Sequence, residues 1–342
     1  MSPHCVAGWA LTMMLSVSAH AEDAYQARHR ELCAAHPLAA APTQKPRAPM
    51  PVPRSQLCRD VDLYYGFDKA PDYAAARECA SDDAKREAVG TLLSGDGVLA
   101  MIYANGQGVP RDIDRAEAYA CKNEWLSNQG LEGVLAQLER MRGDVSGKLD
   151  LCQYADNTPS EADCASVASR WAGVRRGQRI QAYAPASAPA ALKQALVRLR
   201  QAETAFADAR AGDEVDMSGT GRTQFYLSEH DQLEEQVLIN LRDFSTGGFP
   251  QAGAREAAAA DREMAGLLAE LRRRGMPAGS TTITLEGIEK TQAAWLRARA
   301  AWVDFVSVAW PALNRDRVRC RLTRQRIHQL KVLARYAQMP GG

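Results

Sequence analysis

Residues 291–305 read Thr-Gln-Ala-Ala-Trp-Leu-Arg-Ala-Arg-Ala-Ala-Trp-Val-Asp-Phe, and this stretch decides the fold class. Trp295, Trp302 and Ala309 recur every seven residues, which places them on one face of an α-helix. Pro311 ends the helix, because proline lacks a backbone N–H and disfavours helix at the residue before it. We therefore predict a long helix whose aromatic face packs against other helices.

The segment that follows this helix is strongly basic. Between Arg315 and Arg335 there are eight Lys or Arg residues and one acid, Asp316. One interpretation is contact with an anionic partner. The interpretation that we favour is a solvated helix face, because Arg is also a good helix former. The formal net charge of the whole chain is only +1, so no overall field favours nucleic acid as a partner.

Length and composition indicate an all-α protein with more than one domain. The chain has 342 residues, enough for two ordinary domains, and alanine is frequent while β-branched residues are sparse. We predict a short helical-hairpin repeat module over 57–145, followed by a helical bundle over 148–336. Apolar residues at helical spacing predict three bundle helices before the Trp295 helix, over 192–210, 224–244 and 255–274.

The amino-terminal residues resemble an export signal. An apolar run from Val6 to Ser18 precedes Ala19-His20-Ala21, a small-x-small cleavage site, so we predict a signal peptide over 1–21. The run is too short to span a bilayer, and no later segment is long enough to do so. We therefore expect a periplasmic or secreted protein. The next segment, 22–56, is predicted to hold a short helix and then a stiff proline-rich linker.

Cysteine usage suits an oxidising compartment. Seven cysteines follow the cleavage site, so most should pair and at least one should remain over. Cys152 and Cys164 flank eleven residues with polar turn character, and we predict a local disulfide between them, contributing on the order of 3 kcal/mol. The sequence leaves open how the others pair: Cys33, Cys58, Cys79, Cys121 and Cys320. No Cys-x-x-Cys occurs and histidines do not cluster with cysteines, so we expect neither a metal nor another cofactor.

Two related segments lie 40 residues apart in the predicted repeat module. Residues 72–79 and 112–119 each follow a Tyr-Gly element, and such a period is typical of helix-pair repeats. The second copy, over 99–112, resembles the Sel-one-like repeat, a relative of the tetratricopeptide repeat. Gly106 and Gly108 are expected to form the tight turn between its helices, because glycine reaches positive φ cheaply. The other interpretation, a phosphate-binding loop, is less favoured because no Gly-Lys-Ser or Gly-Lys-Thr follows.

The second half of the chain resembles the LprI-type lysozyme inhibitors, a family of small secreted helical proteins. The resemblance covers residues 148–336, beginning at Leu149-Asp-Leu-Cys152 with Cys164-Ala165. Its later motif positions are expected to be structural, and they are Trp295, Trp302, Phe305, Cys320, Thr323 and Arg326.

The chain departs from this family pattern at its strongest signature. Val306-Ser307 replaces the Arg-Asp of the family, and Trp310 stands where the family has its first cysteine. Cys320 has therefore lost its expected partner. It is either a free thiol or bridged to the repeat region.

The resemblance implies a binding protein, with a lysozyme as the candidate partner. Inhibitors of this kind occlude a carboxylate cleft, either with a positioned group or with an acidic surface that complements a basic lysozyme. The basic last helix does not supply an acidic complement. The other hypothesis is a helical-repeat scaffold or adaptor in cell-envelope assembly without inhibitory activity. The sequence does not predict the oligomeric state.

Catalytic residues do not emerge from the sequence, so we predict that the protein is not an enzyme. His230 lies in Ser228-Glu-His-Asp231 and is interpreted as polarity at a helix start rather than as a general base. Glu234 and Glu235 are adjacent, so they point to different helix faces, and both are interpreted as solvated surface.

Overall fold

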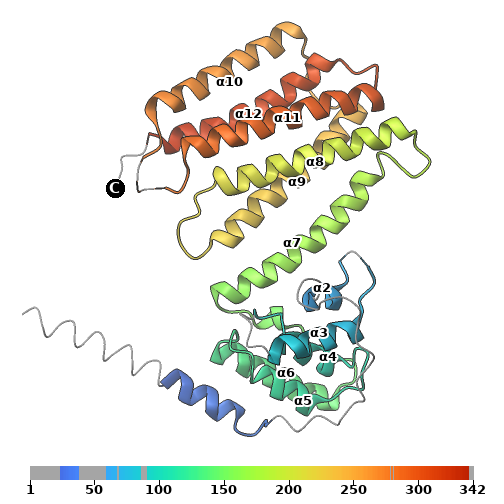
Figure 1. Ribbon diagram of the computed structural model, residues 1–342, viewed down its shortest axis with the longest axis vertical. Coiled ribbons are helices and arrows are strands. Elements are labelled where there is room, and N and C mark those ends of the chain that lie inside the picture. The colour runs from blue at the N-terminus through green and yellow to red at the C-terminus, as the bar shows by residue number, and fades with distance from the viewer. Residues whose placement is uncertain are drawn as a thin grey trace, which may run out of the picture. The chain divides into compact units, whose positions relative to one another are not determined.

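The computed structural model describes residues 24–37, 59–67, 69–85, 91–277, 279 and 281–338, and every regular element among them is helical. This confirms the all-α prediction. The chain divides into two compact units, Met1–Cys164 (unit 1) and Ala165–Gly342 (unit 2), which we describe separately (Figure 1). The predicted signal peptide lies outside the described residues, and so does the predicted linker apart from residues 24–37.

Unit 1 is a series of short helices around one largely buried helix, α4. Each helix packs on the next, α2 on α3, α3 on α4, α4 on α5 and α5 on α6. Helix α4 buries seven of its ten residues, as expected for a helix that is apolar on all sides. The elements are α2 (Asp60–Tyr65), α3 (Tyr73–Lys85), α4 (Asp96–Asn105), α5 (Ile113–Ala120), α6 (Asn128–Gly143) and η1 (Leu151–Tyr154).

The two predicted turn glycines lie between α4 and α5. Gly106 has φ 64° and caps α4 by donating its N–H to the Ile102 carbonyl, a left-handed cap that suits glycine. Gly108 has φ 70°, and a Cβ there would lie 3.2 Å from the Cβ of Tyr73 on α3. Helix α2 ends at a left-handed glycine as well, Gly66. The hairpins α2–α3 and α4–α5 thus share one kind of turn, while their assignment to the Sel-one-like repeat stays a prediction.

A helix over residues 24–33 is attached to α5 and α6 of unit 1. The Cys33–Cys121 disulfide links it covalently to the end of α5. Tyr25 Oη donates to the Leu126 carbonyl at 3.3 Å, and Arg28 pairs with Glu132 at 2.8 Å. The short helix expected at the start of residues 22–56 is therefore present over 24–33, and it belongs to unit 1.

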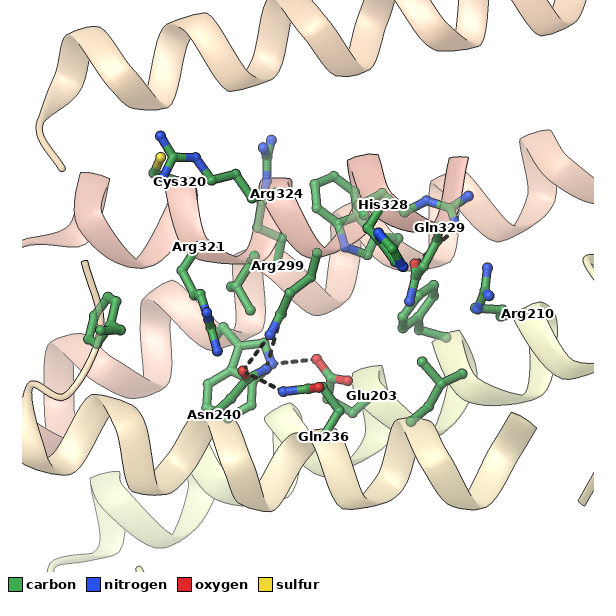
Figure 2. Close-up of a pocket in the computed structure, with 18 of the residues that line it drawn as sticks. Glu203, Arg210, Gln236, Asn240, Arg299, Cys320, Arg321, Arg324, His328 and Gln329 are labelled. Carbon is green, nitrogen blue, oxygen red and sulfur yellow. Dashed lines mark hydrogen bonds between the residues drawn. The ribbon is translucent and has the colours of Figure 1, made fainter. Parts of the chain in front are cut away.

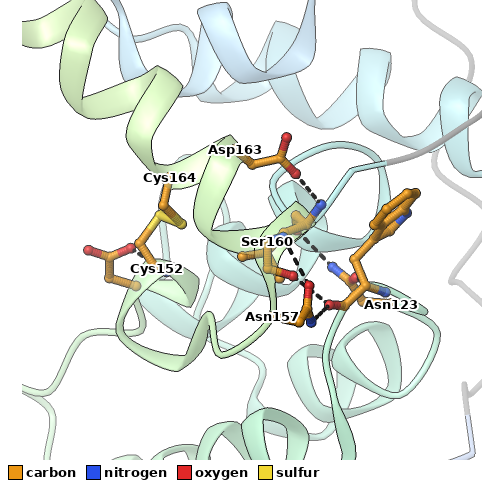
Figure 3. The surroundings of a disulfide bond; sticks show 9 residues. Asn123, Cys152, Asn157, Ser160, Asp163 and Cys164 are labelled. Carbon is orange, nitrogen blue, oxygen red and sulfur yellow. Dashed lines mark hydrogen bonds between the residues drawn. A yellow bond between two sulfur atoms is a disulfide. The ribbon is translucent and has the colours of Figure 1, made fainter. Parts of the chain in front are cut away.

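The Cys152–Cys164 pair is disulfide-bonded, and its segment belongs to unit 1 (Figure 3). We expected the second domain to start at residue 148, whereas the units divide at Cys164, inside helix α7 (Thr158–Gln181). Hydrogen bonds explain the difference. Leu149 N donates to Asn105 Oδ1 at 2.7 Å, and Ser160 Oγ donates to the Trp125 carbonyl at 2.6 Å. Leu92 N donates to Asp163 Oδ2 at 2.8 Å. These contacts hold residues 149–163 against α4 and against the loops at Leu92 and Trp125.

Unit 2 is a bundle of long helices that lie side by side (Figure 1). Helix α8 packs most closely against α11, α10 packs against α12, and α9 packs against α8. The predicted aromatic face forms the core, where Trp302 and Phe305 are fully buried and Trp295 nearly so. The helices are α8 (Ala190–Asp213), α9 (Arg222–Thr246), α10 (Ala254–Arg274), α11 (Leu285–Ala309) and α12 (Arg315–Tyr336), with the second part of α7.

Candidate functional site

A cavity of about 700 Å³ in unit 2 is the candidate functional site (Figure 2). Helices α9 and α12 form its two sides, while side chains from α8 and α11 form its floor. Helices α9 and α12 are not among the closely packed pairs, which leaves the groove open between them. Its size is within the range of small-molecule pockets.

Helical spacing brings the polar residues of each side into the groove. On α9, Gln232, Gln236 and Asn240 are four residues apart and therefore share one face. On α12, Arg321, Arg324 and His328 are three and four residues apart, so they also share one face, and they line the groove. We call these three α12 residues the cationic ridge. Amide groups thus face guanidinium and imidazole groups across the cavity.

One buried carboxylate, Glu214, binds two arginines below the groove. Arg326 donates to it through Nη1 at 2.7 Å and Nη2 at 2.5 Å, and both side chains are 0% exposed. Arg210 donates to the same carboxylate at 2.8 Å and also pairs with Glu229 at 2.5 Å. Burying a charge is costly unless it is paired and hydrogen-bonded, and this network meets both conditions.

Two further carboxylates are shared in the same way. Asp243 pairs with Arg242 at 3.0 Å and with Arg321 at 3.1 Å. Asp261 pairs with Arg299 at 2.5 Å and with Arg319 at 3.0 Å. Arg210 also pairs with Glu229, and Arg319 also pairs with Asp316 at 3.3 Å, so five carboxylates hold these six arginines. Over the whole of residues 165–342 there are 26 Lys and Arg against 18 Asp and Glu, a formal net charge of +8.

The outer part of the ridge faces solvent, and the charge of Glu256 on α10 acts on Arg324. Arg324 and His328 are exposed, and neither forms an ion pair or hydrogen bond with any residue that the structure describes. Arg321 is partly exposed, and its buried Nε donates to no acceptor in that same part of the chain. Arg324 and His328 are therefore available to an anionic group from outside, whereas Arg321 is held by Asp243 at 3.1 Å.

Arg317, one helical turn before the ridge, has a structural role instead. It donates to the carbonyls of Gly247 at 2.8 Å and Pro250 at 3.1 Å, and also to that of Phe249. Its guanidinium lies 4.0 Å from the centre of the Phe249 ring. Arg317 thus fixes the α9–α10 loop at one end of the groove, because Phe249 and Pro250 line the cavity.

Glu203 of α8 lies on the floor of the groove. Its Oε1 accepts a hydrogen bond from Trp302 Nε1 of α11 (Figure 2). Burial raises the pKa of Glu203 to about 7, and the charge of Glu234 adds to this, against the Trp302 hydrogen bond and the charge of Arg200. Arg200 is itself engaged by Glu234 at 2.7 Å. Glu203 therefore exchanges its proton near neutral pH.

Three amides form a cluster between α9 and α12. Asn240 Oδ1 accepts from Gln236 Nε2 at 3.2 Å and from Gln325 Nε2 at 2.8 Å. Asn240 Nδ2 donates to Gln325 Oε1 at 3.4 Å. The cluster fixes the orientation of Gln236, whose Oε1 accepts no hydrogen bond from the described residues.

The motif positions of the LprI resemblance lie in the interior of unit 2, several beside the groove. Arg326 binds Glu214, and Thr323 Oγ1 accepts from Arg299 at 2.9 Å and donates to Asp261 at 3.2 Å. Cys320 is a free, buried thiol, which decides between the two alternatives left by the sequence. Trp295, Trp302 and Phe305 are core residues. Cys152, Cys164, Gly106 and Gly108 belong to unit 1 and contribute nothing to the groove.

Three sequence interpretations need correction. The basic helix is not simply a solvated face, because Arg317 and Arg326 are buried and bonded. Glu234 is buried rather than solvated, because it pairs with Arg200 and accepts from Thr204 Oγ1. His230 is inside α9, not at its start, where it stacks on Tyr226.

Glu203, Arg210 and Glu214 were not predicted from the sequence as site residues. The sequence does contain a signal for them. Leu199 and Phe206 mark the apolar face of α8. Glu203 lies four residues after Leu199, and Arg210 lies four residues after Phe206, so both share that face. Glu214 continues the same spacing. A charged residue in a row of apolar positions is a candidate for a buried ion pair.

No helix in the described part of the chain has the length and apolarity needed to cross a membrane. Within those same residues, no three His, Cys, Asp or Glu side chains gather as a metal site would require.

Comparisons with protein-family models, with curated proteins and with solved structures found no match.

Proposed function

We propose that this chain is a binding protein that acts by occluding a protein partner, with the cationic ridge as its contact. The observation that carries the proposal is the exposed pair Arg324 and His328 at the groove, on a unit whose residues 165–342 have a formal net charge of +8. The surplus positive charge meets solvent at Arg324 and His328. A partner with carboxylates complements this surface, and such complementarity favours rapid and selective association.

A lysozyme-type enzyme is the partner that the LprI resemblance supports. The cleft of a glycoside hydrolase holds a pair of carboxylates, so an inserted guanidinium can form a charge-assisted hydrogen bond with them. The ridge thus supplies the positioned group that occlusion requires. Disulfides within unit 1 suit the periplasmic or secreted location where such an enzyme acts. We retain the Sel-one-like assignment of unit 1 as part of this proposal, with these hairpins as an accessory module.

The groove supports binding rather than hydrolysis. Its lining acids are Glu203 and Glu229, and Glu229 is held by Arg210 at 2.5 Å. Hydrolysis of a glycoside needs two carboxylates on opposite sides of the scissile bond. Glu203 has no such partner among the described lining residues. We therefore propose no enzymatic activity for this site.

Cell-wall lysis by a panel of lysozyme-type enzymes tests the proposal. The purified full chain should inhibit at least one of them, with complete inhibition near an equimolar ratio. An unchanged rate at a large molar excess against every enzyme would contradict the proposal and favour the scaffold without inhibitory activity.

A further inference from the structure

The helix over residues 24–33 buries almost none of its surface in unit 1. Seven of its ten residues are exposed, and none of them is fully buried. An isolated helix of this length is marginal in water, so its stability depends on what attaches it. In Figure 1 the helix (blue) lies at the edge of unit 1, where the Cys33–Cys121 disulfide links it to the end of α5. Its attachment therefore depends on this disulfide and on a few polar contacts.

The noncovalent contacts of this helix are open to solvent. Arg28 pairs with Glu132 of α6 at 2.8 Å, but the two side chains are 43% and 59% exposed, and such pairs contribute little. Tyr25 donates to the Leu126 carbonyl at 3.3 Å, and its own carbonyl accepts from Asn128 Nδ2 at 3.0 Å. Water can replace each of these partners. These contacts alone therefore do not hold the helix in place.

Detachment of the helix would leave no buried charge unpaired. The next contact along the chain is His36 Nδ1, which lies 2.8 Å from the carboxylate of Glu117, a side chain that is 3% exposed. The same carboxylate also pairs with Arg142 of α6 at 2.7 Å. Glu117 therefore keeps a charged partner within unit 1 when residues 24–36 leave it.

An imidazole lies beside the two sulfur atoms. His29 Nε2 is 3.0 Å from the Cys121 carbonyl and 4.0 Å from Cys33 Sγ. Because a carbonyl only accepts, Nε2 carries the hydrogen. Both cysteines lie at helix C-termini, where the helix dipole disfavours a thiolate, so the dipole does not distinguish them. The His29 N–H stabilises a thiolate on Cys33, which makes Cys33 the better leaving group.

We infer that the Cys33–Cys121 disulfide is a thiol-exchange site, at which a dithiol reductant releases residues 24–36 from unit 1. Both cysteines are half-buried rather than fully buried, so a small thiol reaches them. The attacking thiolate bonds to Cys121 Sγ, and the electron pair of the broken S–S bond goes to Cys33 Sγ beside His29. The second thiol of the reductant then attacks the mixed disulfide, and Cys121 leaves as a thiolate. The reductant becomes a disulfide, and its two protons end on Cys33 and Cys121.

The Cys152–Cys164 disulfide is a matched comparison within the same unit. Its two cysteines are also half-buried, so access does not separate the two disulfides. Hydrogen bonds hold its segment in place without the bond, from Leu149 N to Asn105 and from Ser160 Oγ to the Trp125 carbonyl. Reduction of this pair therefore leaves its two thiols side by side, which favours re-formation of the bond.

Graded reduction of the folded full chain with dithiothreitol tests the inference, with alkylation and peptide mapping at each step. Cys33 and Cys121 should be alkylated at least about 10-fold faster than Cys152 and Cys164, because only the first pair separates once it is reduced. The buried thiol of Cys320 should stay unmodified, which shows that unit 2 is still folded.

Hydrogen exchange on the same samples follows the helix directly. The amides of residues 24–36 should lose protection when the pair is reduced, while those of α6 keep theirs. These measurements need no variant.

The role of His29 has its own test. Glutathione, a monothiol, followed by an acid quench traps the mixed disulfide, and the adduct should be found on Cys121 rather than on Cys33. His29→Leu removes the N–H and should slow the reduction of this pair about 3- to 10-fold, with no change at Cys152 and Cys164.

Three results would overturn the inference. These are reduction of both disulfides at the same rate, alkylation of Cys33 and Cys121 only together with Cys320, and unchanged protection of residues 24–36 after the pair is reduced. Glutathione trapped on Cys33 would contradict the role of His29. The inference does not rest on inhibition of a lysozyme, which is assigned to the cationic ridge of unit 2, so the two proposals can fail separately.

Discussion

Arg326 of α12 and Glu214 at the end of α8 form a bidentate ion pair from which solvent is excluded. Both side chains are 0% exposed, and the two N–O distances are 2.7 Å and 2.5 Å. Gln292 Oε1 accepts from Arg326 Nε at 2.9 Å and Gln329 Oε1 accepts from Nη1 at 3.3 Å, so all three guanidinium nitrogens donate. The pair fixes the position of α12, and with it the groove, relative to α8.

Loss of this pair should destabilise unit 2. Arg326→Met leaves Glu214 buried with only Arg210 as a partner, and we expect a loss on the order of 3 kcal/mol in the free energy of unfolding. Arg326→Lys should not restore stability, because an ammonium cannot form the bidentate contact. Urea unfolding measures both variants. Arg335→Met, at an exposed position of the same helix, should change stability by less than about 0.5 kcal/mol. Equal effects of Arg326→Met and Arg335→Met would refute this role.

Glu203 should make stability depend on pH with a defined sign. Its pKa is raised from 4.5 to about 7 in the folded chain, so the protonated form is favoured by folding. Its contribution is complete below about pH 4.5 and is lost as the pH rises through 7. The Glu203→Gln variant does not lose this stability as the pH rises, because glutamine does not ionise. The variant should match the natural chain at pH 4.5 and exceed its unfolding free energy at pH 8 by up to about 3 kcal/mol.

Urea unfolding of the natural chain and of Glu203→Gln at pH 4.5 and pH 8 measures this. The other titrating groups are the same in both proteins, so their effects cancel when the two unfolding free energies are subtracted. A difference in stability that is the same at pH 4.5 and pH 8 would show that Glu203 does not titrate in the folded chain.

Many features of the fold could be predicted from the sequence because they depend on local pattern. The seven-residue spacing of Trp295 and Trp302 specifies a buried helical face whatever lies opposite. Left-handed turns at Gly106 and Gly108 follow from the glycines themselves. Short-range pairing of Cys152 with Cys164 needs no knowledge of the rest of the chain.

The groove could not be predicted in this way because its parts are distant in sequence. Glu214 and Arg326 are 112 residues apart, and only the packing of α8, α11 and α12 brings them together. Basic residues of α12 look alike in the sequence, yet Arg326 is buried while Arg324 is exposed. The two kinds of arginine differ in burial: the structural arginines are buried and the others are free to bind a partner. Burial cannot be read from the sequence.

The turn after α4 should require glycine. Gly106→Ala places a Cβ at φ 64°, which costs about 1–2 kcal/mol for an L-residue. The matched control is Gly143→Ala at the end of α6, where φ is not positive and no atom lies within 4 Å of an added Cβ. Gly143→Ala should leave thermal stability unchanged or slightly higher. A Gly106→Ala protein as stable as the control would contradict the requirement.

Removal of the Cys152–Cys164 bond should weaken unit 1. The double substitution to serine opens a loop of sequence separation 12, and the expected loss is about 3 kcal/mol. Peptide mapping of the unreduced natural chain gives an independent check. Cys320 should be alkylated after unfolding, whereas Cys152 and Cys164 should not. Alkylation of both would exclude the bond.

The measurement that tests the central claim most directly is inhibition of cell-wall lysis by charge-reversed variants of the full chain. Arg324→Glu with His328→Glu reverses the exposed part of the ridge, while Arg198→Glu on α8 reverses an exposed arginine that does not line the groove. We expect the natural chain and Arg198→Glu to inhibit a susceptible lysozyme-type enzyme equally, and the double variant to lose inhibition by 10-fold or more at low salt. Equal inhibition by all three proteins, or by none, would contradict the assignment of the ridge as the contact surface.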